Sequence, residues 1–434
     1  MRRLLLTAVL LAVTPGAATS SANRPLLTFA VAPISVRGGV LSLGLCATDL
    51  QGNTFRLTEP HYNDRQSWSP DGRSIAFVGP ADPPGQDHGI DLFVADAQGQ
   101  HARDLTSNGG RGSPTDVFGW SPDSSELGGN WSGLGSSVFI ANADGTGTRL
   151  LAYTNYGAYV FGDSWSPDGR RILLSRSSFG NMAPAISVIN PDGTNEQKLV
   201  AAADLASWSP DGQQFAYYSY TDWPRASGLG VAQADGSNAH LLLQGMNLTA
   251  RPMWSPDGQH LAYVESDGSL GVVRADGTDA RVLANGVIDT PQWSPDGNSI
   301  AFTRGPQQAP QVTVVRLDGS GEQDVAAGFD PVWRVPAPLP SDRRPCIVRG
   351  TSRADVIHGT GRGDVIFAGR SNDRVYGGGG DDVIVGGLGQ DRLYGGPGND
   401  RFDTRDRLRD YVFGGSGTDR AFHDPVDVLS SIKY

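Results

Sequence analysis

Lysine is nearly absent from this chain, and its scarcity limits what the chain can bind. Only Lys198 and Lys433 occur among 35 basic residues, and the formal net charge of the 434 residues is -11. An acidic chain without a basic cluster is a poor ligand for nucleic acid and for anionic membrane surfaces. The composition therefore favours cations, soluble proteins and glycans as partners.

The chain also lacks an apolar run long enough to span a bilayer, because its most apolar stretch, residues 4–13, is too short. Arg2 and Arg3 precede this stretch and small residues follow it, which is the order of regions in an export signal. An N-terminal strand or anchor is the alternative. We therefore expect residues 1–22 to be a signal peptide and the protein to be secreted, either extracellular or periplasmic, without membrane insertion.

Helix-favouring composition is missing as well. The chain contains 58 Gly and 28 Pro, with only 38% hydrophobic residues. Gly and Pro interrupt helices and are common in turns, so this composition favours many short strands. The predicted fold class is all-β.

A repeated Trp-Ser-Pro-Asp sequence organises most of the chain. Copies begin at Trp68, Trp120, Trp165, Trp208, Trp254 and Trp293, with a degenerate seventh copy at Trp333. A spacing of about 40 to 50 residues is typical of the four-stranded blades of a β-propeller. Ser-Pro-Asp-Gly forms a tight turn, and we interpret the Trp residues as packing residues rather than as a functional site.

The number of repeats predicts seven blades over residues 23–335. Seven Trp strands are present, but one lacks its own set of three further strands unless residues 27–58 supply it. We therefore expect these N-terminal strands to pair with the strand at Trp333 and close the ring. Six or eight blades stay possible, because Ser124 replaces the turn glycine in the second repeat and that blade is expected to be irregular.

The Trp-Ser-Pro-Asp-Gly run, followed by an apolar triplet, resembles the WD-like propeller repeats of the TolB family over about residues 27–335. TolB-like proteins are exported and act as interaction platforms, so the resemblance implies the same role here. The N-terminal domain of TolB has no visible counterpart, and its particular partners are not carried over.

Two long connections opposite the Ser-Pro-Asp-Gly turns combine aromatic and polar side chains, and variable loops on a rigid scaffold often bind partners. Such a surface suits a peptide or a sugar, so we expect a protein or carbohydrate partner. The alternative is that these aromatics only pack the loops. The predicted binding face consists of Tyr156, Tyr159, Asp163, Tyr220, Asp222, Trp223 and Arg225.

Common catalytic motifs are missing, including Gly-x-Ser-x-Gly, a phosphate-binding loop and His-Glu-x-x-His. A binding module rather than an enzyme is therefore expected, with no catalytic residue assigned. The competing hypothesis is a polysaccharide lyase or hydrolase on the propeller's loop face. Its candidate acid, base and charged residues are His61, Asp64, Asp87, His88, Asp163, Asp222 and Arg225.

After an expected linker, residues 336–348, the sequence becomes a nonapeptide repeat that extends through residues 349–434 with a C-terminal cap. Gly-Gly-x-Gly-x-Asp recurs, and it resembles the repeat of RTX proteins, which implies a calcium-binding parallel β-roll. Glycines expose backbone carbonyls and Asp supplies a hard anionic oxygen. The predicted ligands of several Ca²⁺ ions are Asp355, Asp364, Asp373, Asp382, Asp391, Asp400 and Asp419 with Gly377, Gly378, Gly380, Gly386, Gly387 and Gly389.

Calcium is expected to drive the folding of this roll. Two nonapeptides make one turn, so Asp364, Asp382 and Asp400 stack along one edge. Strands lie about 4.8 Å apart, and two carboxylates at that distance repel by about 3 to 4 kcal/mol at an effective dielectric constant near 20. Ions between the turns reverse this term. A metal-free Gly-Asp solenoid is the alternative.

The two cysteines, Cys46 and Cys346, fit neither a zinc site nor a paired-thiol redox motif. The predicted closure of the propeller brings them near each other, so a disulfide is expected in an oxidising compartment. We expect the protein to be monomeric.

Overall fold

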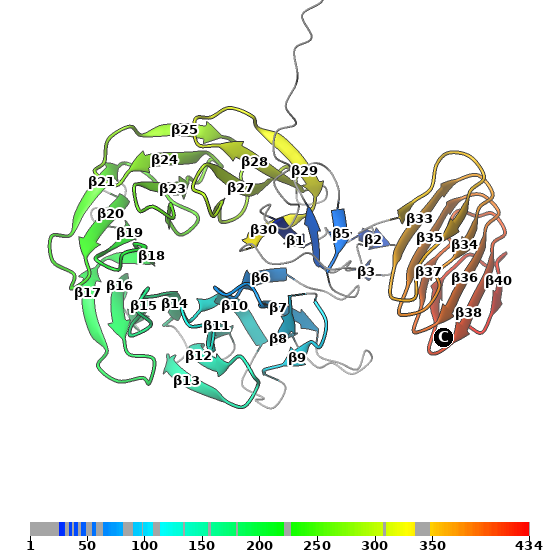
Figure 1. The fold of residues 1–434 in the computed structure, drawn as a ribbon, viewed down its shortest axis with the longest axis horizontal. Coiled ribbons are helices and arrows are strands. Elements are labelled where there is room, and N and C mark those ends of the chain that lie inside the picture. Colours follow the sequence, from blue (N-terminus) through cyan, green and yellow to red (C-terminus); the bar gives the residue numbers. More distant parts are fainter. Residues whose placement is uncertain are drawn as a thin grey trace, which may run out of the picture.

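The computed structural model describes residues 26–30, 34–36, 39–41, 45–48, 54–57, 64–80, 90–97, 99–106, 113–132, 135–154, 158–178, 181–220, 227–306, 310–334 and 348–433. Strands form a ring of sheets followed by a separate stack of parallel strands (Figure 1). Within these ranges, no helix is long and apolar enough to cross a membrane. The predicted all-β fold is confirmed.

Seven four-stranded antiparallel sheets make up the ring, and six of them use strands that are consecutive in sequence. The first three of these blades contain β6 Asp64–Trp68, β7 Ser74–Pro80, β8 Ile90–Asp96 and β9 Arg103–Asp104; β10 Ser113–Trp120, β11 Glu126–Ser132, β12 Ser136–Asn142 and β13 Thr148–Tyr153; and β14 Val160–Trp165, β15 Ile172–Ser178, β16 Asn181–Ile189 and β17 Gln197–Ala201. The next three contain β18 Ala203–Trp208, β19 Gln214–Ser219, β20 Gly228–Gln233 and β21 His240–Gln244; β22 Met253–Trp254, β23 His260–Val264, β24 Leu270–Arg274 and β25 Arg281–Ala284; and β26 Gln292–Trp293, β27 Ser299–Arg304, β28 Gln311–Arg316 and β29 Gln323–Ala327.

The seventh blade joins the two ends of the propeller sequence. Its strands, in the order β30-β1-β4-β5, are Phe329–Arg334, Leu26–Ala30, Leu45–Thr48 and Thr54–Arg56. Leu27 lies opposite Trp333 in the antiparallel pair of β1 and β30. The predicted seven blades and their closure by the N-terminal strands are confirmed. A short hairpin of β2 Ile34–Val36 and β3 Gly39–Leu41, between β1 and β4, is an addition that we did not predict.

The repeated Trp residues tie neighbouring blades together. Each is nearly buried, and in most blades its indole N–H donates to a backbone carbonyl on the first strand of the preceding blade. The pairs are Trp120 with Ser67 (3.1 Å), Trp165 with Gly119 (3.2 Å), Trp254 with Ser207 (3.1 Å), Trp293 with Met253 (2.9 Å) and Trp333 with Gln292 (3.0 Å). At the closing blade, Trp68 donates instead to the Thr28 hydroxyl at 3.0 Å. These contacts support the interpretation of the Trp repeat as packing.

The second blade has all four strands but is irregular, as expected, because the pairing of β10 with β11 shifts register twice. Ser124 adopts the left-handed conformation (φ 64°) that glycine supplies in the other copies of this turn. Gly128 and Gly129 of β11 replace the expected apolar residues because aromatic rings occupy the space. A Cβ atom would lie 2.0 Å from the Phe118 ring at Gly128 and 2.3 Å from the Phe139 ring at Gly129.

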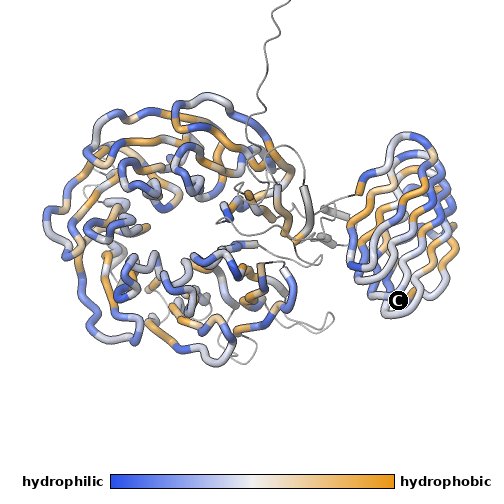
Figure 2. The backbone as a smooth tube through the Cα atoms, viewed as in Figure 1, coloured by the Kyte–Doolittle hydropathy of each residue, from blue (hydrophilic) through white to orange (hydrophobic). Residues whose placement is uncertain are grey.

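The C-terminal part is a roll of two parallel five-stranded sheets (Figure 1). The first sheet contains β31 Val348–Arg349, β33 Val365–Arg370, β35 Val383–Leu388, β37 Arg401–Asp403 and β39 Arg420–Phe422; the second contains β32 Val356–His358, β34 Arg374–Tyr376, β36 Arg392–Pro397, β38 Tyr411–Ser416 and β40 Val428–Ser430. Ile366 pairs with Ile384 and Ile384 with Phe402, a register of one turn. These apolar side chains fill the space between the sheets. Hydrophobic segments, drawn in orange, run through the strands of the roll (Figure 2).

Cys46 is fully buried in β4. Cys46 is disulfide-bonded. Cys346 lies outside the described residues, so its pairing with Cys46 stays a prediction.

Candidate metal centre and propeller cavity

Two columns of buried Asp side chains run along the edges of the roll. Seven Asp residues of this part are 3% exposed or less: Asp364, Asp373, Asp382, Asp391, Asp400, Asp410 and Asp419. In six of them, all but Asp364, one carboxylate oxygen accepts the backbone N–H of an Asp one turn earlier. The Asp364 N–H bonds Asp382 (2.7 Å), and the Asp382 N–H bonds Asp400 (2.9 Å). The structure therefore brings together the predicted stack of Asp364, Asp382 and Asp400.

The second carboxylate oxygen of most of these residues is buried without a donor. Among the described residues, this holds for Oδ2 of Asp373, Asp391, Asp400, Asp410 and Asp419, and for Oδ1 of Asp364. A buried charged oxygen without a partner costs several kcal/mol. Calcium prefers hard oxygen ligands, so these oxygens fit a bound calcium ion.

Glycines make room for these oxygens. A Cβ atom at Gly377, Gly386, Gly395 or Gly414 would lie 2.0 to 2.8 Å from the carboxylate five residues later in the sequence. Gly378 and Gly387 have a different role, because φ is positive and a Cβ would meet the backbone of the preceding turn within 2.0 Å. Gly380 and Gly389 also have positive φ (85° and 150°). The predicted glycines thus allow close stacking, and Gly377 and Gly386 also border a carboxylate.

Burial raises the pKa values of the central carboxyls. The pKa is raised to about 7 for Asp391 and Asp400, and to about 8 for Asp410, first because burial disfavours the charge. Neighbouring carboxylates, such as Asp373 beside Asp391, add to this effect. Protons therefore compete with a metal ion for these carboxyls near neutral pH.

The first repeats differ from the central ones. Thr351 replaces a glycine, and its backbone N–H donates to Asp355 Oδ2 at 2.6 Å. Thr360 does the same for Asp364 Oδ2, also at 2.6 Å. Because a local donor already satisfies this oxygen, we expect the first turns to bind calcium more weakly than the central ones.

Asp410 joins the column of Asp373 and Asp391, although we did not include it among the ligands. The Asp391 N–H bonds Asp410 Oδ1 at 2.7 Å. Asp410 continues the Asp series after a one-residue slip, and Val412, two residues later, keeps the apolar spacing, so the position was visible in the repeat although it was left out of the ligands. Within the described ranges, no group of three or more His, Cys, Asp or Glu side chains gathers as a metal site, so backbone carbonyls would have to complete the coordination.

Three residues of the predicted binding face come together in the propeller. Tyr220 donates to Asp204 at 2.8 Å. Burial, with the nearby Asp204 and Asp163, raises the pKa of Tyr159 to about 12. Asp204 was not predicted, yet an Asp four residues before the repeated Trp recurs at 64, 116, 204 and 289 and was a usable signal. The other residues predicted for this face, Tyr156, Asp222, Trp223 and Arg225, and the candidates His61, Asp87 and His88, lie outside the described residues.

Asp163 links two blades. Its carboxylate accepts the Ser175 hydroxyl at 2.6 Å, and Ser175 Oγ accepts the Leu205 N–H of the next blade at 3.0 Å. Only 5% of Asp163 is exposed, and burial raises its pKa to about 7. This carboxyl is therefore part of the blade interface rather than of an open surface.

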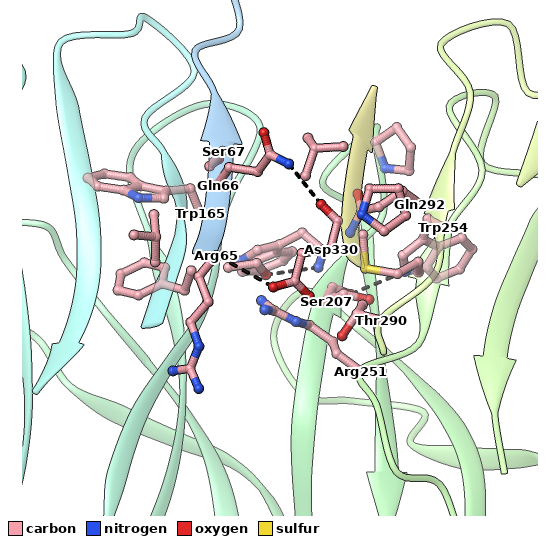
Figure 3. Close-up of a pocket in the computed structure, with 18 of the residues that line it drawn as sticks. Arg65, Gln66, Ser67, Trp165, Ser207, Arg251, Trp254, Thr290, Gln292 and Asp330 are labelled. Carbon is pink, nitrogen blue, oxygen red and sulfur yellow. Dashed lines mark hydrogen bonds between the residues drawn. The ribbon is translucent and has the colours of Figure 1, made fainter. Parts of the chain in front are cut away.

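A cavity of about 410 Å³ lies between the first strands of the blades, on the axis of the propeller (Figure 3). Gln66 is buried, donates its amide to the Asp330 carbonyl at 2.9 Å, and has no partner for Oε1 within the described part. The Arg65 N–H points to Asp330 Oδ2 at 3.4 Å. Arg251 and Thr290 complete this polar wall, and Trp165, Trp208 and Trp254 contribute apolar surface. The volume and mixed lining suit a small ligand or an inserted side chain.

The fold and the carboxylate columns define a seven-bladed β-propeller joined to a parallel β-roll of the calcium-binding type. The family described as RTX calcium-binding nonapeptide repeat (4 copies) matches residues 349–384 and 376–406. The C-terminal part therefore carries RTX calcium-binding repeats, as the sequence predicted. No curated protein matches the chain by sequence.

Solved propellers resemble the rest of the chain. The tricorn protease aligns at a TM-score of 0.51 and 12% identity, over 70% of this chain and 35% of that one. TolB from Acinetobacter baumannii aligns at 0.46 and 18%, over 60% of this chain and 66% of that one, so the match spans under two thirds of its length. An oligogalacturonate lyase in complex with manganese aligns at 0.47 and 14%, over 70% and 86%. Such identities concern the fold alone.

Proposed function

We propose that this chain is an exported calcium-binding protein whose C-terminal roll folds when Ca²⁺ binds. The propeller then acts as a platform for a protein or carbohydrate partner. The observation that carries the proposal is the set of buried carboxylate oxygens without donors, such as Oδ2 of Asp391, Asp400 and Asp419. Calcium supplies positive charge to these oxygens, so binding and folding are linked.

Trypsin digestion of the full chain tests the calcium part. Residues 349–420 contain eleven Arg, each a cleavage point once the roll unfolds, and no Trp. We expect calcium to protect these arginines and a chelator to expose them, with the cut sites identified by mass spectrometry. Tryptophan fluorescence, which reports the propeller, is the internal control. Identical digests in calcium and in chelator would refute the proposal.

The platform part rests on the cavity and on the cluster around Asp204. Substituting Arg251 by Ala, with Arg281→Ala on the outer strand β25 as a matched control, tests the cavity. A partner that uses the cavity binds the control like the wild type and binds R251A more weakly. Equal binding of both variants would place the partner elsewhere.

The alternative, a polysaccharide lyase or hydrolase on the loop face, predicts turnover of a polysaccharide. Two buried carboxyls of the propeller, Asp163 and Asp289, have pKa values raised to about 7. Each accepts a hydrogen bond from a hydroxyl group of its own blade, Ser175 for Asp163 and Thr303 for Asp289. Their engagement favours a binding role. Incubation with a broad polysaccharide panel decides between the two functions, because sustained product formation requires an enzyme.

A further inference from the structure

The outer face of the second roll sheet carries two ordered columns of side chains. Arg374 pairs with Arg392, and Arg392 with Tyr411, along one column. The parallel column contains His358, Tyr376, Tyr394 and Phe413, whose rings stack at centroid distances of 4.7 to 5.0 Å. We call these two columns the Arg-aromatic face.

This face is open to solvent. Arg374 and Arg392 are exposed, and neither has an ion-pair partner in the part of the chain that the structure describes. Val356 and Val428, at the two ends of the arginine column, are 63% and 45% exposed.

The other sheet is covered instead. Val365 and Val383 also point outward from the roll, yet they are only 1% and 3% exposed and belong to one hydrophobic cluster with Leu27 and Trp333 of the closing blade. Figure 1 shows β33 and β35 on the propeller side and β34 and β36 on the far side. The roll therefore packs one sheet toward the propeller and presents the Arg-aromatic face outward.

The charges of the roll are divided between inside and outside. Residues 349–433 contain eleven Arg and Lys433 against thirteen Asp. Seven of these Asp residues are buried in the carboxylate columns. The outside consequently has twelve basic residues against six acidic ones, although the whole chain has a net charge of -11. With calcium on the inner carboxylates, the roll presents a basic surface.

We infer that the Arg-aromatic face binds a linear acidic polysaccharide through the sugar carboxylates. Guanidinium groups pair with carboxylates in a bidentate geometry, and two of them lie on adjacent strands, about 4.8 Å apart. The Tyr376 and Tyr394 hydroxyls provide donors for sugar hydroxyls beside them. Nucleic acid is disfavoured, because the rings stack on one another and leave no free face for a base.

This inference rests on the proposed calcium-driven folding, so the Arg-aromatic face forms only when calcium is bound. Without the ion the roll unfolds, the columns disperse and the thirteen Asp residues cancel the basic charge. The polysaccharide therefore binds only the calcium-loaded protein.

Binding of the full chain to hyaluronate fragments, measured by calorimetry in calcium and in chelator, tests this inference. We expect binding in calcium alone, and binding about tenfold weaker in the R374Q/R392Q variant because two charge-assisted bonds are lost. The matched control is R353Q/R370Q, which removes the same charge from exposed positions outside this sheet. The control should bind within about twofold of the wild type, by the same reasoning.

The outcomes separate this inference from the proposed function. If calcium protects the roll from trypsin in R374Q/R392Q as in the wild type, the variant is folded and its hyaluronate affinity is decisive. Equal affinity of both double variants would overturn the inference, as would stronger binding of duplex DNA or of phosphatidylserine vesicles through the same arginines. If calcium gives no protection to the wild type, the proposed function itself fails.

Discussion

Replacing Asp400 by Asn should stabilise the metal-free roll and weaken its calcium binding. Asp400 is fully buried; Oδ1 accepts the Asp382 N–H at 2.9 Å and Oδ2 has no donor among the described residues. Burial raises its pKa from 3.8 to about 7. This difference corresponds to about 4 kcal/mol by which the ionised carboxylate destabilises the metal-free roll above pH 7. Asn keeps the Oδ1 acceptor and removes the charge.

Without calcium at pH 8, we therefore expect D400N to stabilise the roll by about 2 to 4 kcal/mol. With calcium, the variant loses a ligand and its calcium affinity falls at least about tenfold, the loss expected for one charge-assisted contact. Because the wild-type roll is expected to be unfolded without calcium, the first effect is measured as the fraction of metal-free D400N roll that resists trypsin, and calorimetry measures the calcium affinity.

The control for this prediction is D381N, one residue outside the column. Asp381 Oδ1 accepts the Asn399 N–H at 2.7 Å on the partly exposed turn. Its substitution should change the free energy of unfolding of the roll by less than about 0.5 kcal/mol. A metal-free roll that D400N destabilises, or equal calcium affinities for D400N and D381N, would refute the electrostatic reasoning.

Three further predictions follow from the same structure. G395A should abolish the central calcium site, because its Cβ would lie 2.0 Å from Asp400 Oδ2, whereas G361A, with nothing within 4 Å, should leave the calcium heat unchanged in calorimetry. Protonation of Asp391 and Asp410 stabilises the metal-free roll fully below pH 3.8, and this stabilisation is lost as the pH rises through 7 to 8. The stabilisation by calcium should therefore grow from pH 6 to 8. Calorimetry in buffers of different ionisation enthalpy should detect the protons that calcium releases. L27A should lower the free energy of unfolding of the propeller by about 2 to 5 kcal/mol in urea, monitored by Trp fluorescence, because Leu27 is fully buried opposite Trp333 in the closing blade.

Local repeats made much of the fold predictable. The Ser-Pro-Asp-Gly turn fixes where each blade begins, and the count of Trp strands predicts the closing pair of Leu27 and Trp333. The links between blades were not predictable, because they join residues far apart in sequence. Asn130 Oδ1, for example, accepts the Gly162 N–H at 2.8 Å, and no sequence pattern around either residue predicts this contact.

The site was predictable where the period is strict. A nine-residue repeat, together with the two nonapeptides per turn that the resemblance to RTX repeats implies, predicts the stack of Asp364, Asp382 and Asp400. Burial and orphaned oxygens do not follow from spacing, and Asp410, after the one-residue slip, was left out of the ligands. The basic exterior was also hidden, because a net charge of -11 averages over acids that point inward and arginines, such as Arg374 and Arg392, that point outward.

The closing blade imposes an order on folding. β1 pairs with β4 on one side and with the distant β30 on the other, and the bond from the Thr28 hydroxyl to the Val332 carbonyl spans 304 residues. As the chain emerges from its N-terminus, β1 stays an unsatisfied sheet edge until almost the whole propeller has been made, and such edges promote aggregation. Because contacts this distant slow folding, the ring depends on slow closure or on assistance that shields its first strands.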